Sequence, residues 1–374
     1  MPVIVLADSF VVGKSDGTEA DALIDMAEKE LLRAQDSLDF GDRVSGGALL
    51  IRAEDLLAEA EALIGRTERI EQIGAEIDRE MEDVLLVQPL YGLVDPLLTF
   101  PADAEPHRVL VSDQDLFVLD TARQQVEHFQ IDPSGAVVSD PLGEVVLREG
   151  DVVEGQRIGR LADIAWQPLV PGVEDKSNLL VLDHNKTVFR FNDRVDGATV
   201  LAFGDQESWQ APAQIDTYLG RIYLADEGAG QIYRYNPGQY QATPEHWFQF
   251  QAPVNLAGLL TMAIDGDIWL LINSGVILRY SAGEQVPFSL DSSVGYAEKP
   301  VDMVVGAADT GLIYLADAAE ERIMVFDKSG AYQYQLTAAE GNPLRELRSL
   351  FVDDLSGVLY ILTDSALYTH PLPR

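Results

Sequence analysis

The chain of 374 residues contains no cysteine. This absence excludes disulfide bonds, thiolate metal ligands and cysteine nucleophiles, and it leaves the redox compartment open. No apolar run approaches the roughly 18 residues that a membrane-spanning helix requires, so we expect no direct membrane insertion of this segment. The apolar start, residues 1–10, has no basic region before it and therefore does not read as a secretory signal.

Basic residues are scarce, and only six of them are lysines. The 26 Lys and Arg residues face 62 Asp and Glu residues, which gives a formal net charge of −36 and a pI near 4.2. Such a surface repels phosphate backbones, so we expect no nucleic-acid partner. Cationic ligands, divalent ions and basic protein surfaces are compatible with this charge, although acidity can also serve solubility alone.

The first 83 residues predict a short strand followed by two helices. The apolar stretch Val3–Val12 predicts the strand, and GKSDGT (13–18) predicts a turn that ends at a capping Thr18. Beyond it, apolar residues recur at spacings of three and four, which places them on one helix face. These residues are Ala20, Leu23, Ile24, Ala27, Leu31, Ala34 and Leu38.

A second, longer helix follows the break at DFGDRVSGG (39–47). Two apolar stripes joined by a short turn predict an αα-hairpin, which resembles a single tetratricopeptide-type helix pair. The second stripe consists of Leu49, Leu56, Leu57, Ala60, Leu63, Ile64, Ile70, Ile77 and Met81.

The helical segment is strongly acidic. Residues 18–83 hold 19 acidic and seven basic side chains, a net charge of −12. One interpretation is a solvated outer face, and the other is a docking arm that a basic protein partner binds. The residues we select for partner binding are Glu54, Glu59, Glu61 and Glu68.

From residue 84 the helical period ends and one apolar block recurs six times. The last residues of successive blocks are 63, 43, 46, 45 and 46 positions apart, so the first interval carries an insertion of roughly 18 residues. Periods of about 40–50 residues with four strands each are typical of propeller blades. The blocks are LFVLD (116–120), LLVLD (179–183), IYLAD (222–226), IWLLI (268–272), IYLAD (313–317) and LYILT (359–363).

The sixth block lies too near the end of the sequence for a fourth strand to follow it. An earlier segment must then complete the last blade, because an unpaired strand edge promotes aggregation. Residues 84–94 are the first candidate for this closing strand, and residues 3–12 are the alternative.

The block [IL]-Y-[LV]-[AL]-D, followed by a turn and I-x-[RV]-[FY], resembles the repeats of NHL-type and SMP-30-like propellers over residues 84–374. The resemblance implies a six-bladed β-propeller in residues 84–374. Together with the strand and α-helical hairpin that the apolar periodicity predicts in residues 1–83, it gives a mainly β chain of two domains. The whole arrangement is similar to extracytoplasmic regions of some bacterial multidomain signalling proteins. The resemblance therefore favours an extracytoplasmic location without fixing the compartment.

Polar residues near the starts of the innermost strands are the candidate ligand site. Equivalent positions there should face the mouth of the central channel, where propellers bind ligands. The alternative is that a water-filled channel simply needs a polar lining. The residues are Asp163, Gln214, Thr261, Asp302 and Ser349.

Catalytic chemistry has little support in the sequence. A lactonase of the SMP-30-like type would need a metal held by acidic and amide side chains, yet Asp163 and Asp302 have no evident Glu and Asn partners. The aspartates that end four of the blocks fit side-chain bonding within turns better than a Ca²⁺ ring. We therefore predict a non-catalytic ligand- or protein-binding module with no cofactor. The alternative is a metal-dependent lactonase or hydrolase, with Ca²⁺ or another divalent ion in the channel.

Overall fold

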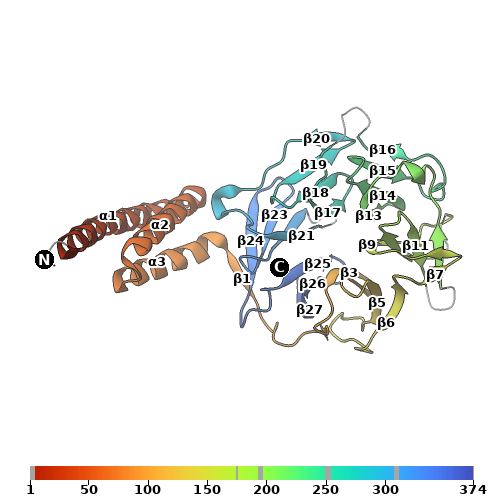
Figure 1. Cartoon of the computed structure of the whole chain (residues 1–374), viewed down its shortest axis with the longest axis horizontal. Helices are drawn as coiled ribbons and strands as arrows, with labels where there is room; N and C mark the ends of the chain where they lie inside the picture. The colour runs from red at the N-terminus through yellow and green to blue at the C-terminus, as the bar shows by residue number, and fades with distance from the viewer. Residues whose placement is uncertain (1–4, 174–175, 193–196, 249–253, 307–310, 374) are drawn as a thin grey trace. The chain divides into compact units, whose positions relative to one another are not determined.

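A computed structural model describes residues 5–173, 176–192, 197–248, 254–306 and 311–373 (Figure 1). The chain divides into two compact units. One comprises residues 1–87 together with 291–296, and the other comprises residues 88–290 and 297–374. The first unit is helical, and the second consists of β-sheets.

Three helices occur in the described part of the first unit: α1 (Val5–Asp39), α2 (Arg43–Ile64) and α3 (Glu68–Leu85). The short η2 turn (Ser292–Val294) belongs to the same unit. The predicted strand at Val3–Val12 is wrong, because its described residues are the start of α1. A helix satisfies its own backbone hydrogen bonds, whereas a strand needs a partner. The glycines at 13 and 17 lie within this helix at a cost of about 1 kcal/mol each.

The predicted helical hairpin is confirmed, but its second helix is divided into α2 and α3. Gly65 ends α2 with φ 75°, a conformation that glycine adopts without strain. Thr67 then begins α3, and its side chain accepts a hydrogen bond from the backbone N–H of Ile70. Gly65 thus ends one helix and Thr67 caps the start of the next, and the apolar periodicity alone does not show this boundary.

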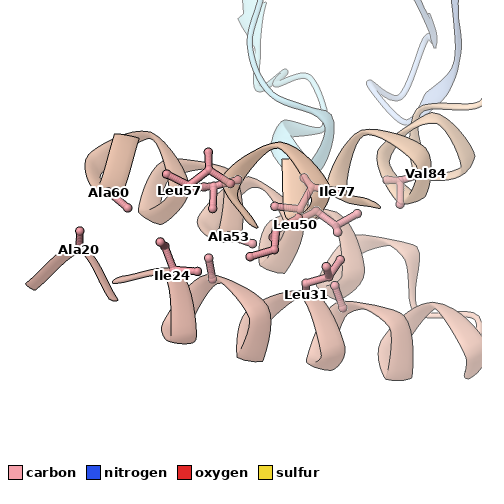
Figure 2. Packing of buried hydrophobic residues seen from close by; sticks show 13 residues of the cluster. Ala20, Ile24, Leu31, Leu50, Ala53, Leu57, Ala60, Ile77 and Val84 are labelled. Carbon is pink, nitrogen blue, oxygen red and sulfur yellow. The ribbon is translucent and has the colours of Figure 1, made fainter. Parts of the chain in front are cut away.

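Small residues let the helices pack closely (Figure 2). Alanines repeat every seven residues on α1 and again on α2, and all of them are fully buried. Because alanine adds little bulk, the helix backbones can approach while the longer Ile and Leu side chains fill the space beside them. The fully buried alanines of the cluster are Ala20, Ala27, Ala34, Ala53 and Ala60.

The second unit is a six-bladed β-propeller, as predicted. Six sheets of four or five antiparallel strands account for its blades in the described residues. In chain order the blades are β3 (Pro106–Ser112), β4 (Asp115–Asp120), β5 (Gln125–Gln130), β6 (Glu144–Arg148); β9 (Leu161–Gln167), β10 (Asn178–Asp183), β11 (Val188–Phe191), β12 (Ala198–Leu201); β13 (Pro212–Tyr218), β14 (Arg221–Asp226), β15 (Gln231–Tyr235), β16 (Glu245–His246); β17 (Leu259–Ile264), β18 (Ile268–Ile272), β19 (Ile277–Ser281), β20 (Glu284–Val286); β21 (Pro300–Val305), β22 (Leu312–Asp317), β23 (Arg322–Asp327), β24 (Tyr332–Ala338), β1 (Val87–Leu90); and β25 (Leu347–Asp353), β26 (Val358–Thr363), β27 (Ala366–Pro371), β2 (Leu98–Thr99). The η1 turn (Gln206–Ser208) precedes the third blade.

Each recurring block is the second strand of its blade. The block at 179–183 within β10 is buried on both faces, as its uninterrupted apolar run requires. Both faces of a blade pack against its neighbours, so the sequences of these strands are continuously hydrophobic and do not alternate between apolar and polar residues. This packing explains why the blocks made the fold recognisable from the sequence.

The last blade is closed by β2, not by the predicted segment 84–94. Leu98 pairs with Leu367, and Thr99 pairs with Ala366. The segment 84–94 instead supplies β1, which adds a fifth strand to the preceding blade. Closure by β2 leaves only a short loop before β3 begins the first blade, and short connections are the rule between neighbouring strands. Residues 3–12 do not close the ring either, since residues 5–12 belong to α1.

The insertion predicted in the first interval occurs at two places. One is the long connection between β5 and β6, residues 131–143. The other is a small hairpin of β7 (Val152–Val153) and β8 (Gln156–Arg157), which lies in the chain between the first two blades. Neither segment disturbs the four-stranded pattern of the blades beside it.

Candidate functional site

The five predicted channel residues occupy one repeated position of the fold. Every innermost strand pairs with the second strand of its blade, and this pairing contains a register shift near the end of the block. The residue of the innermost strand that follows the shift lies opposite the penultimate residue of the block. Asp163 thus pairs with Leu182, and Asp302 pairs with Ala316. The same register places Gln214, Thr261 and Ser349 at this position in the remaining three of these five blades.

The sixth member of this ring of equivalent positions is Arg108, which the sequence analysis missed. It lies on β3 opposite Leu119, beyond the same register shift. The spacing along the sequence could have identified it, because Arg108 precedes the last residue of its block by as many residues as Gln214 precedes Asp226, the last residue of its own block. We call these six residues the channel ring, after the predicted position of five of them; that they face the mouth of a channel stays a prediction.

Asp302 joins three blades. Its Oδ1 accepts hydrogen bonds from Thr261 Oγ1 at 2.6 Å and from the backbone N–H of Met303 at 2.8 Å. Its Oδ2 accepts from Ser349 Oγ at 2.7 Å and from the backbone N–H of Leu350 at 2.8 Å. Three of the six ring positions are therefore bonded to one another through a single buried carboxylate.

Asp163 does the same for the first three blades. Its Oδ1 accepts from Arg108 Nη1 at 3.0 Å, and its Oδ2 accepts from the backbone N–H of Ile215 at 2.9 Å. Burial opposes the charge of Arg108, but the carboxylates of Asp163, Asp302 and Asp216 outweigh that effect and raise the pKa of the guanidinium. Arg108 is therefore a cation that compensates the charge of these three carboxylates.

Gln214 completes the chain of contacts between the third and fourth blades. Its Nε2 donates to the backbone carbonyl of Leu260. Its Oε1 is buried and has no hydrogen-bond partner in the described part of the chain. With this bond, the hydrogen bonds of the ring connect the first blade to the sixth without a gap, and most of its polar groups join neighbouring strands.

Asp216 is a second carboxyl that the sequence analysis missed. It lies two residues beyond Gln214 on β13, hence on the same face of that strand. It is only partly buried, and its Oδ1 accepts a hydrogen bond from the backbone N–H of Thr217 at 2.7 Å. Burial raises the pKa of Asp216 to about 7 and the charge of Asp163 adds to the shift, whereas Arg108 opposes it.

Replacing Asp216 with Asn is expected to stabilise the protein at neutral pH and above. A carboxyl with a raised pKa contributes its full stability below its ordinary pKa of 3.8 and loses it as the pH rises through about 7. The advantage of Asp216→Asn should therefore grow by about 1–2 kcal/mol between about pH 5.5 and about pH 8, after allowance for solvent screening. Urea unfolding at both pH values measures it. The exposed Asp103→Asn is the control, and an advantage of Asp216→Asn that does not change with pH would refute the assignment.

The aspartates that end four of the blocks bond to backbone, as the turn interpretation predicts. Asp226 accepts from the N–H groups of Gln210, Ala211 and Ala229 at 2.6, 2.8 and 2.9 Å. The first two belong to the loop before the blade and the third belongs to the turn after the block. The same arrangement, with backbone N–H donors before the blade, recurs at Asp120, Asp183 and Asp317.

No group of three or more His, Asp or Glu side chains in the described residues could hold a metal ion. A divalent ion in the channel stays a prediction. Among the helices whose residues the structure describes, none is long and apolar enough to cross a membrane.

The strand pairing and the ring define the class of this protein: a six-bladed β-propeller that carries N-terminal helices. No family model and no curated protein matches the chain. Solved structures similar to it include the WD40 β-propeller domain of Doa1, at 12% identity and TM-score 0.45, covering 73% of this chain and 95% of that one. Another is YCF48 bound to D1 peptide, at 10% identity and TM-score 0.47, covering 76% and 99%. A nidogen/laminin complex matches at 12% identity and TM-score 0.45, covering 64% and 82%. At these scores the assignment of the fold rests on the strand pairing within the chain itself.

Proposed function

We propose that this chain is a non-catalytic binding module, a sensor or scaffold that presents surfaces to a ligand or a protein. The observation that carries the proposal is the bonding of Asp163 and Asp302, whose oxygens accept hydrogen bonds from neighbouring blades. A metal-dependent hydrolase of this fold would need such carboxylates to hold the ion or to act as a base. No observation on the described residues favours that alternative.

We also propose that the propeller is of the NHL-like or SMP-30-like kind. The support is the recurring block, which forms the second strand of each blade, together with the six-fold repetition. By the same resemblance, we propose that the protein acts as an extracytoplasmic part of a bacterial signalling system.

The acidic faces of α2 and α3 are the surface that we propose for a basic protein partner. Glu54, Glu59, Glu61 and Glu68 are all exposed. Few cations offset the charge of these helices, since residues 18–83 carry a net charge of −12. Complementary charge accelerates association and fixes orientation, so a lysine- or arginine-rich surface fits this face.

Charge reversal on α2 should weaken this interaction strongly. The variant with Glu59→Lys and Glu61→Lys is expected to bind its partner at least about tenfold more weakly, because two attractive charges become repulsive. The partner would be captured from native extract with the whole chain, then purified, and its affinity measured at two salt concentrations.

The matched control carries the same charge change on the propeller, at the exposed Glu207 and Glu340. An equal loss of affinity in this control would show that only net charge matters and would contradict the proposed surface. Unchanged affinity in the α2 variant would do the same.

A further inference from the structure

The insertion in the first interval of the repeat contributes residues to a cavity between the first two blades. Its hairpin, β7–β8, turns at Glu154 and Gly155, which have φ values of 51° and 85° and thus suit a tight two-residue turn. At the tip, Glu154 Oε2 accepts a hydrogen bond from the backbone N–H of Val200 on the outer strand of the second blade. At the base, Ile158 is 1% exposed, and its backbone bonds to Asp151 and Gly150. The hairpin is therefore held at both ends.

Beside this hairpin lies a cavity of about 450 Å³. The hairpin and the loop after it contribute Arg157 and Arg160, and the turn after the second block contributes His184 and Asn185. Glu149 is the one carboxylate of the lining. Volumes of about 300–1,000 Å³ are those in which proteins bind small molecules.

The lining contains guanidinium hydrogen-bond donors that do not bond to other side chains of the described residues. Among the described residues, Arg157 makes a single side-chain hydrogen bond, to the carbonyl of Gly150 at 3.2 Å. Arg160 has no side-chain hydrogen bond or ion pair within the described part of the chain, and it is exposed. Several arginines elsewhere on the propeller face carboxylates instead, as Arg279 does with Asp267 at 2.7 Å. In a chain with 62 acidic and 26 basic residues, these two arginines share one cavity lining, and neither makes an ion pair with a carboxylate within the described part of the chain.

We propose that this cavity binds a small organic anion through a carboxylate or phosphate group. The guanidinium groups of Arg157 and Arg160 match planar oxyanions and can donate two parallel hydrogen bonds each. Asn185 and His184, which also line the cavity, add further hydrogen-bond donors. Because the net charge of −36 repels anions from the rest of the surface, such a ligand needs a local group of cations.

This site is separate from the acidic face proposed for the protein partner. The arginines lie in the β-sheet unit, whereas Glu59 and Glu61 lie in the helical unit. Failure of one proposal therefore leaves the other intact, and the Glu59→Lys, Glu61→Lys variant should retain the anion affinity.

Titration of the whole chain with inorganic phosphate, and separately with succinate, tests the cavity. NMR or calorimetry at low ionic strength should show saturable binding of at least one of them. The variant with Arg157→Gln and Arg160→Gln should weaken it at least about tenfold, because two charges near the anion are removed. Glu149→Gln should strengthen binding, since it removes the repelling carboxylate. The preference between phosphate and succinate then identifies the anionic group.

The matched control is Arg43→Gln with Arg345→Gln, two exposed arginines away from the cavity lining. Binding in this control should stay within about twofold of the wild type, apart from the general salt effect. Equal weakening in the control would overturn the proposal, because it would reveal attraction by net charge alone. Absence of binding of both anions to the wild type at millimolar concentration would also overturn it.

Discussion

Replacing Asp302 with Ala is expected to lower the free energy of unfolding by about 3–5 kcal/mol. The change removes the acceptor of four hydrogen bonds, those from Thr261, Met303, Ser349 and Leu350, and leaves their donors buried without a partner. An unpaired buried donor costs about 1–3 kcal/mol, so the loss exceeds that of an ordinary surface change. Chemical unfolding followed by tryptophan fluorescence measures it.

Two further variants sharpen this test. Ser349→Ala and Thr261→Ala each remove one donor, so each should cost about 1 kcal/mol and leave the carboxylate of Asp302 in place. The exposed Asp103→Ala should change stability by less than about 0.5 kcal/mol. If Asp302→Ala were as mild as Asp103→Ala, the carboxylate would not join the blades as the geometry indicates.

Replacing Arg108 with Met is expected to destabilise the protein by about 3 kcal/mol near pH 8. The substitution keeps most of the apolar volume but removes the cation that lies 3.0 Å from Asp163, whose side chain is 3% exposed. Without Arg108, the folded-state pKa values of Asp163 and Asp216 rise further. A carboxyl with a raised pKa destabilises the folded state as the pH rises through that value, so the loss should shrink towards about pH 5.

The partner variant Asp163→Asn provides the control for this effect. When Asp163 is already neutral, Arg108→Met should cost less than it does in the wild type, and the difference is the coupling energy of the pair. Thermal unfolding of both single variants and of the double variant at two pH values gives this cycle. Additive effects, or a loss independent of pH, would mean that Arg108 acts through packing alone.

The blades were predictable because their signal is repeated and local. Each second strand is buried on both faces, so packing selects the same apolar block six times, as in LLVLD (179–183). The repetition even located the insertion whose hairpin now forms one wall of the proposed anion cavity.

In the helical unit, the local apolar pattern was not enough to predict the helix boundaries. The stripe that contains Leu57 and Ile77 continues across Gly65, so periodicity indicated one helix where two exist. The segment Val3–Val12 is equally compatible with a strand by composition, whereas residues 5–12 are continuous with the rest of α1 in the structure.

The sequence by itself determined the propeller, its blade count and five of the six positions of the channel ring. Those features follow from apolar blocks and turn residues that act within one blade. Only the tertiary structure decided that β2 closes the last blade and that Asp163 and Asp302 bond to other blades. The hydrogen bonds from Arg108 to Asp163 and from Ser349 to Asp302 join residues 55 and 47 positions apart, and the pairing of β2 joins the two ends of the propeller. A blade-length pattern contains no information about such partners, because they meet only when the ring closes.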